Sequence, residues 1–452
     1  MSAAQFVREA PSIGHSVGAK SVLPGAATWI PLIILTMPVR EISLWELGSV
    51  HGRIGDMVLA GAFSVWFAAG SARGSFRLVR NQLDAVVVGF LLYYGLSLIW
   101  ADNPSEGVIR LGKLERNGML YIVLVDYLSA DFPDAYKRLA VCLLITGLMQ
   151  SVAFMWSMAE HGGVTAIALL LQAESVQSNN NILDVVRTNQ GAGIFLRGAA
   201  IWLPLCMFVG YGIVSGIRSW AFALSNRLLI LIMGALTILG VSRAAWIGLV
   251  AGFGVIWLLA LPHLTKKKLF SAGAATLLVL LVAWHFNAHS LIMSRIALDE
   301  VSQDPAVIER LDFYAYTMDR FAESPILGTG VASISPDELF IVHNLYLQIL
   351  GELGIVGGGL FVWIMGLWSW YLVTLRNAAV VRGDQAGRQV VASLLGLTLF
   401  FFVSFLSGND LGGGEPWVIM GIASAMYTYG RQQGLIYSRS PLLQPGAVGA
   451  SA

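Results

Sequence analysis

Long apolar runs separated by short polar links dominate the chain. A helix needs about 20 apolar residues to cross the hydrocarbon core, and about twelve segments approach this length. The expected spans are 22–39, 54–70, 83–100, 117–130, 139–158, 191–215, 226–241, 244–262, 269–285, 344–373, 389–407 and 416–430. This pattern predicts an all-α polytopic membrane protein, organised over residues 1–452 as a single integral membrane domain.

The polar links differ in their content of Lys and Arg, which are enriched on the cytoplasmic side of membrane proteins. The short link 263–268 carries three Lys residues, and the link 374–388 carries three Arg residues. With these links in the cytoplasm, the N- and C-termini are also predicted to be cytoplasmic. The segments expected on the external side are 40–53, 101–116, 159–190, the turn at Ser242–Arg243, 286–342 and 408–415.

The longest external segment, residues 286–342, contains a predicted helix. Asp304–Pro305 is typical of an N-cap followed by proline at the first helical position. Ser324–Pro325 ends the helical pattern. Between them, apolar residues recur at helical spacing: Ile308, Leu311, Ala315, Met318 and Phe321. We expect an amphipathic helix that lies on the membrane surface or covers a cavity.

A polar stripe opens the span 344–373. Asn344, Gln348 and Glu352 recur every four residues and therefore share one helix face. At 1.5 Å rise per residue the stripe would run roughly 12 Å into the membrane. Polar side chains at that depth are costly and usually face protein or a wet cavity. We predict that these three residues line such a cavity, with His343 at its rim.

Four side chains are candidates for chemistry, and three of them have two interpretations. His343 either anchors a helix end at the interface or acts as a general base. Arg243, in a tight turn between two apolar runs, either reaches to the interface or binds phosphate. Arg197 lies well inside its predicted span, which leaves it less room as an interfacial anchor. Arg310, beside acidic residues on the amphipathic helix, either forms a surface ion pair or binds substrate.

The last external turn adds two carboxylates. Asp410 and Glu415 either assist the base and orient a sugar, or are solvated in the loop. No His, Cys or carboxylate cluster has the spacing of metal ligands, so we expect neither a metal nor another cofactor. Cys142 and Cys206 lie within apolar runs, where membrane-core packing is the simplest interpretation.

Composition agrees with a membrane protein. Of the 452 residues, 56% are hydrophobic and only 12% are charged, and the mean hydropathy is +0.70. Soluble domains carry about 25% charged residues. The formal net charge of +1 and the lack of a basic patch with interleaved aromatic residues exclude nucleic acid as an expected partner.

Three pieces, in this order, resemble the O-antigen ligase and O-antigen polymerase-like superfamily. The first is Val241-Ser242-Arg243-Ala244-Ala245-Trp246 at the head of a span. The second is Glu309-Arg310 followed by Ser324-Pro325-Ile326-Leu327-Gly328-Thr329-Gly330. The third runs from His343-Asn344 to Glu352-Leu353-Gly354. The resemblance covers residues 190–410.

This resemblance implies a GT-C-type membrane glycosyltransferase in the bacterial inner membrane. Such an enzyme takes a glycan from undecaprenyl diphosphate at the periplasmic face. The resemblance implies His343 as the general base and Arg243 and Arg310 as ligands of the diphosphate. We add Arg197 on its depth alone. The expected reaction is that of an O-antigen ligase, which transfers O-polysaccharide to a sugar hydroxyl of lipid A–core with inversion and without a metal.

Two related activities stay open. A polymerase of O-units and a protein O-oligosaccharyltransferase would use the same donor and the same arginine and histidine residues, and would differ only in the acceptor. A transporter of lipid-linked glycan is an alternative of another class. It gains no support because the chain shows no internal repeat and because the candidate residues are expected on one side of the membrane.

Overall fold

The computed structural model describes residues 24–36, 43–47, 50–72, 78–160, 190–213, 219–239, 243–260, 305–334, 344–406, 408 and 412–436. His343, Asp410 and the predicted span 269–285 lie outside these residues. Arg197 and Arg243 are described as parts of helices, but their side chains are not.

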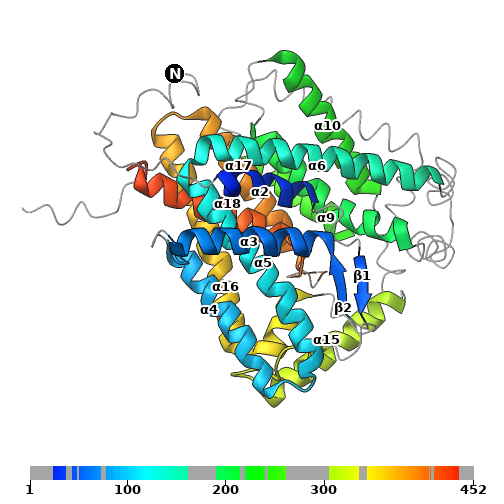
Figure 1. Ribbon diagram of the computed structural model, residues 1–452. Coiled ribbons are helices and arrows are strands. Elements are labelled where there is room, and N and C mark those ends of the chain that lie inside the picture. Colours follow the sequence, from blue (N-terminus) through cyan, green and yellow to red (C-terminus); the bar gives the residue numbers. More distant parts are fainter. Residues whose placement is uncertain are drawn as a thin grey trace, which may run out of the picture.

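Helices account for nearly all of the described structure (Figure 1). They are α2 (Pro24–Thr36), α3 (Ile54–Ala72), α4 (Gln82–Leu96), the 3-10 helix η2 (Ser97–Trp100), α5 (Pro104–Ala130), α6 (Phe132–Glu160), α9 (Gln190–Ile213), α10 (Trp220–Leu239), α11 (Arg243–Ala260), α15 (Pro305–Glu323), α16 (Leu345–Val381), α17 (Gln385–Ser404) and α18 (Glu415–Gln432). Every predicted span within the described residues overlaps one of these helices.

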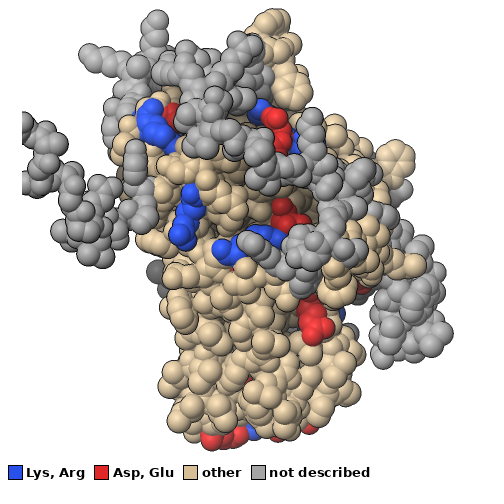
Figure 2. Space-filling view, turned by 60° about the vertical axis from the view of Figure 1, so that its left-hand side comes forward, with Lys and Arg blue, Asp and Glu red and all other residues tan. Residues whose placement is uncertain are grey.

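Among the described residues, five helices are long and apolar enough to cross a membrane. They are Gln82–Trp100, Phe132–Trp156, Trp220–Ile238, Leu345–Val381 and Gln385–Ser404. Three shorter apolar helices accompany them: Asp56–Ser71, Ile201–Ile213 and Ala244–Leu259. On the face shown in Figure 2, the lower half carries few charged residues, as a lipid-facing surface requires. The prediction of a polytopic membrane protein is thus confirmed, whereas the count of about twelve spans stays a prediction.

Two of the segments expected on the external side contain regular structure that the hydropathy pattern does not predict. Residues 40–53 contain an antiparallel hairpin of β1 (Ser43–Leu47) and β2 (Val50–Arg53), so the described structure is not wholly α-helical. Gly48-Ser49 between the strands is a hairpin signal that the search for apolar spans does not detect. Residues 101–116 are not a loop, because α5 already begins at Pro104 and continues through the predicted span.

The early start of α5 has a local cause. The side-chain oxygen of Asn103 accepts a hydrogen bond from the backbone N–H of Glu106, and Pro104 occupies the first turn. An N-cap followed by proline starts a helix independently of hydropathy. The same combination at Asp304–Pro305 predicted α15, and the structure confirms that helix over Pro305–Glu323.

A kink at Gly354 divides α16 into two parts. Gly354 has φ 64° and ψ −164°, which interrupts the helical hydrogen bonds. The segment after α15 replaces them. Its carbonyl groups accept from Ile355 N (2.9 Å) and Val356 N (3.2 Å), and its Thr329 and Gly330 N–H groups donate to carbonyls of the preceding turn of α16 at 3.1 and 2.9 Å. The loop and the kink therefore form one backbone-paired unit.

The kink also corrects the predicted direction of the polar stripe, which was expected to run along one continuous helix. The part of α16 after the kink, from Ile355 to Val381, is about 40 Å long at 1.5 Å per residue, which suffices to cross the hydrocarbon core. Gln348 and Glu352 lie before the kink. They belong to a short helical segment that folds back beside the first turns of the straight part, since the Tyr346 and Phe361 rings are 5.9 Å apart and a Cβ atom added to Gly358 would lie 3.6 Å from the Leu350 side chain.

Candidate active site

Helix α17 aligns the two helices that carry the predicted arginines. Gln389 Nε2 donates to the carbonyl oxygen of Tyr211 at 2.7 Å, and the Ser393 hydroxyl donates to the carbonyl of Phe208. Later residues of α17 contact earlier residues of α9, so the two helices are antiparallel. Arg197 lies about three helical turns before Phe208 on α9. The same register therefore brings the backbone of Arg197 level with the last turn of α17.

Helix α11 packs against α17 in the same antiparallel sense. A Cβ atom added to Gly252 would lie 2.6 Å from the carbonyl oxygen of Gly396, and one added to Gly248 would lie 2.8 Å from the Phe400 ring. The same register places Arg243, the first residue of α11, level with the last turn of α17. The backbones of both arginines are therefore brought to the same end of α17.

The first residues of α16 are attached to this end. Leu345 N donates to the carbonyl oxygen of Phe405 at 2.9 Å, and the Tyr346 hydroxyl donates to the carbonyl of Phe402, also at 2.9 Å. The turn that follows His343 in the chain is thus fixed beside the end of α17. We refer to this place, where α9, α11, α16, α17 and α18 meet, as the α17 end.

Asn344 has a structural task here. Its backbone is extended, and its side-chain oxygen accepts from Tyr346 N (3.1 Å) and Leu347 N (3.2 Å) as the N-cap of α16. An N-cap satisfies backbone N–H groups that have no partner inside the helix. The polar stripe therefore consists of Gln348 and Glu352, because the Asn344 side chain is engaged by the backbone.

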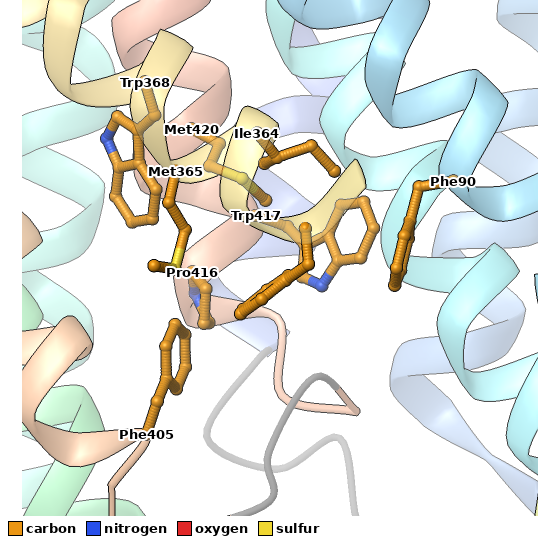
Figure 3. A pocket seen from close by; sticks show the side chains of 9 residues that line it. Phe90, Ile364, Met365, Trp368, Phe405, Pro416, Trp417 and Met420 are labelled. Atoms are coloured by element: carbon orange, nitrogen blue, oxygen red, sulfur yellow. The ribbon is translucent and has the colours of Figure 1, made fainter. Parts of the chain in front are cut away.

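Two small cavities lie at the α17 end. The first, of about 20 Å³, is apolar and is lined by Phe90, Phe361, Ile364, Met365, Trp368, Phe405, Pro416, Trp417 and Met420 (Figure 3). The second, of about 50 Å³, is lined by Ile201, Phe401, Ser404, Phe405, Gly408, Glu415 and Pro416. Phe405 and Pro416 line both. One water needs about 10–15 Å³, so these cavities have room for a few waters and not for a sugar.

Glu415 brings a buried carboxylate to the second cavity. It is the first residue of α18 and is 3% exposed, so it is not the solvated loop residue of one sequence interpretation. The backbone before it is held by α5. Asn117 Nδ2 donates to the carbonyl oxygens of Gly412 (2.9 Å) and Gly413 (3.1 Å), and Arg116 also donates to Gly412 at 2.9 Å.

Residues 228–362 match the family model described as O-Antigen ligase. This match supports the O-antigen ligase-like superfamily for the chain. The family implies in general a multi-pass membrane enzyme of the glycosyltransferase type, with a lipid-linked glycan and a lipid acceptor. Arg243, Arg310 and the start of α16 lie within the matched residues, whereas Arg197 lies before them. A comparison with curated proteins gave no match.

Gln348 and Glu352 belong to the residues that match the O-antigen ligase family model, and their side chains face α5. Glu352 is 2% exposed, and its carboxylate accepts from Arg110 Nη1 at 3.1 Å and from Gln348 Nε2 at 3.3 Å. Arg110 also donates to Glu106 at 3.3 Å. Gln348 and Glu352 line neither of the two described cavities. Their buried ion pair joins the first turns of α16 to α5.

Sequence reasoning did not find Arg110. Residues 101–116 are expected only as an external segment, to which the sequence pattern assigns no secondary structure and therefore no defined face. The available signal was local: the Asn103–Pro104 start and the spacing of Glu106 and Arg110, which places opposite charges one turn apart on a helix. The partner Glu352 is 242 positions away in the chain, and spacing alone gives no means of pairing the two.

No described hydrogen bond or ion pair joins Arg310 to the α17 end. It is half-buried on α15, whose buried Thr317 packs against Gly351 of α16. Arg320, near the end of α15, forms ion pairs with Asp102 and with Glu323. The described hydrogen bonds and ion pairs therefore hold α15 against the kinked part of α16 and the start of α5, and they do not join Arg310 to the α17 end.

Proposed function

We propose that this protein is an O-antigen ligase. It transfers O-polysaccharide from undecaprenyl diphosphate to a sugar hydroxyl of lipid A–core at the periplasmic face of the bacterial inner membrane, with both termini in the cytoplasm. One observation carries the proposal beyond the family match. The helices that bear Arg197 and Arg243 both pack against α17 in a register that brings the two residues level with its last turn, and the start of α16, directly after His343, is attached to that same turn.

The electrostatics of the α17 end favour a diphosphate. Helices α11, α16 and α18 all begin there, and the N-terminus of a helix carries a partial positive charge and free N–H groups. Asn344 already caps α16, and α18 begins with the carboxylate of Glu415. The start of α11 has no such acidic residue in its first turn and carries Arg243. It is the best anion site of the three.

The roles of the residues follow from this arrangement. Arg243 and Arg197 bind the diphosphate through charge-assisted hydrogen bonds and stabilise the charge that develops as it leaves. Arg310 is added to them on the family resemblance alone, which implies it as a further ligand of the diphosphate. His343 accepts the proton of the acceptor hydroxyl. The hydroxyl oxygen attacks the anomeric carbon, the bond from that carbon to the phosphate oxygen breaks, and the electron pair leaves with undecaprenyl diphosphate. Direct displacement inverts the anomeric configuration.

The proposal is tested by transfer with purified components in vesicles. Lipid-linked glycan and lipid A–core are supplied, and both glycosylated acceptor and free undecaprenyl diphosphate are measured. Loss of one charge-stabilising donor typically lowers turnover by about 10²–10³, and we expect this for Arg243→Ala and Arg197→Ala. Arg227→Ala is the matched control, because Arg227 is exposed on α10 and is expected to retain activity. Full activity of Arg243→Ala would refute its role.

The base and the acceptor need separate experiments. His343→Ala with near-wild-type turnover would show that the histidine is not the base. A second lipid-linked unit, or a pilin-like protein, is offered in place of lipid A–core to the same preparation. Preference for either would assign the polymerase or the protein-glycosylating activity instead. Movement of intact donor across the vesicle without release of undecaprenyl diphosphate would contradict a transferase altogether and indicate a transporter.

A further inference from the structure

Helix α15 has three distinct faces. At 100° per residue, Phe313, Thr317 and Arg320 fall on the side that packs against the protein, and Thr317 is fully buried. A second side carries exposed acidic residues, Asp312 and Asp319. The third side is an exposed apolar stripe. We define the α15 stripe as Ile308, Leu311, Ala315 and Met318.

The α15 stripe is open to the surroundings of the protein. Leu311 is 58% and Met318 is 46% exposed. The sequence pattern assigns these residues to the apolar side of an amphipathic helix, and the structure shows that α15 turns this side away from the protein. The side chains that contact the protein are mixed: aromatic, hydroxyl and basic. An apolar stripe beside an acidic one, both exposed, is typical of a helix that lies between two different solvents.

The apolar surface continues from α15 onto a membrane span. The chain leaves α15 through Ile326 and Leu327, which are both exposed. Backbone hydrogen bonds tie this segment to Ile355 and Val356, the first residues of the long straight part of α16. Ile355 is itself 59% exposed. One exposed apolar surface therefore runs from the first residues of the straight part of α16 to the end of α15.

The ion pair of Arg320 fixes the height of α15 relative to the membrane. Its partner Asp102 directly follows η2, where the span Gln82–Trp100 ends. Two spans, α4 with η2 and the straight part of α16, thus end next to the same helix. A helix that adjoins the ends of two spans lies at the level of the bilayer interface.

From these observations we propose that α15 is an interfacial helix, with the α15 stripe immersed in the outer leaflet of the bilayer and the acidic side in water. The occupant of the apolar surface is lipid, because the surface is continuous with that of the spans. The acidic residues face away from anionic headgroups into the periplasm. This inference concerns where α15 lies and does not depend on the catalytic roles proposed for Arg310 or His343.

The test measures the solvent on each side of α15. Single cysteines replace Leu311, Met318, Asp312 and Asp319 in a variant with Cys142→Ala and Cys206→Ala, and each carries a nitroxide label in lipid vesicles. Collisions with oxygen, which concentrates in lipid, are compared with collisions with a water-soluble nickel complex. We expect the oxygen-to-nickel ratio to be several-fold higher at positions 311 and 318 than at positions 312 and 319.

Two results would overturn the proposal. Equal, water-like ratios at all four positions would place the α15 stripe in the periplasm. Protection of positions 311 and 318 from both reagents would show that another segment of the protein covers them. If the cysteine-free variant does not fold, the same labels are introduced into the native background. Cys142 and Cys206 are both buried, so they are expected to label slowly there.

Discussion

The buried ion pair between Arg110 and Glu352 gives a prediction whose magnitude depends on which partner is removed. Arg110→Met leaves the carboxylate of Glu352 buried, with Gln348 as its described side-chain partner. Glu352→Gln leaves the positive charge of Arg110 better compensated. The Arg110 side chain is 19% exposed to solvent and still bonds Glu106 at 3.3 Å. Arg110→Met therefore leaves a buried charge without its ion-pair partner, whereas Glu352→Gln leaves a charge that keeps both solvent and a carboxylate partner.

Breaking a buried pair typically costs about 3–5 kcal/mol, because one charge stays buried without its partner. We expect a loss in this range for Arg110→Met. For Glu352→Gln we expect a loss of about 1–2 kcal/mol, the usual cost of an impaired hydrogen bond to a charged group. The double variant Arg110→Met with Glu352→Leu removes both charges and is expected to be more stable than Arg110→Met alone.

The free energy of unfolding is measured in mixed detergent micelles for the wild type, the two single variants and the double variant. Glu106→Gln serves as the matched control. It removes the more exposed partner of Arg110, and we expect a loss below about 1 kcal/mol. Equal losses for the two single variants would refute the predicted asymmetry. A double variant no more stable than Arg110→Met alone would refute the pairing, since removal of the second charge would then bring no relief.

Three further substitutions test the backbone of the site. Gly354→Ala is expected to cost about 1–3 kcal/mol in unfolding free energy, because φ 64° with ψ −164° is nearly restricted to glycine; Gly359→Ala, with no atom within 4 Å, should be neutral. Gly252→Ala should push α11 off α17 and lower glycan transfer at least about tenfold through misplacement of the α11 start, whereas Gly254→Ala on the same helix should not; equal activities would contradict this. Asn344→Ala should destabilise α16 by about 1 kcal/mol and Asn344→Asp should not, as measured by thermal unfolding, if the residue is a cap.

Local signals in the sequence predict local structure well in this protein. The apolar runs predict the helices because lipid-facing helices need apolar side chains along their whole length. The boundaries of α15 follow from Asp304–Pro305 and Ser324–Pro325, because capping and proline effects act within one turn. The same rule at Asn103–Pro104 would have predicted the start of α5, where hydropathy alone misplaces it.

The remaining features depend on contacts between distant parts of the chain. Gly354 is one of many glycines in apolar helices, and only its pairing with the segment after α15 makes it a kink. Glu352 and Arg110 form a pair only once α5 and α16 are packed together. The order of Arg197 and Arg243 along their helices is visible in the sequence. That both residues lie level with the last turn of α17 is not visible in the sequence, because it depends on how α9 and α11 pack against α17.

The pairing of the segment after α15 with the kink of α16 has a consequence for chain length. The four hydrogen bonds join backbone atoms on both sides of Gly328, so most side chains there can change without breaking them. An inserted or deleted residue between Ile326 and Thr329 cannot be absorbed, since it would slip one pair of bonds against the other. In the segment between α15 and α16, the number of residues around Gly328 is therefore more strictly determined than their identity.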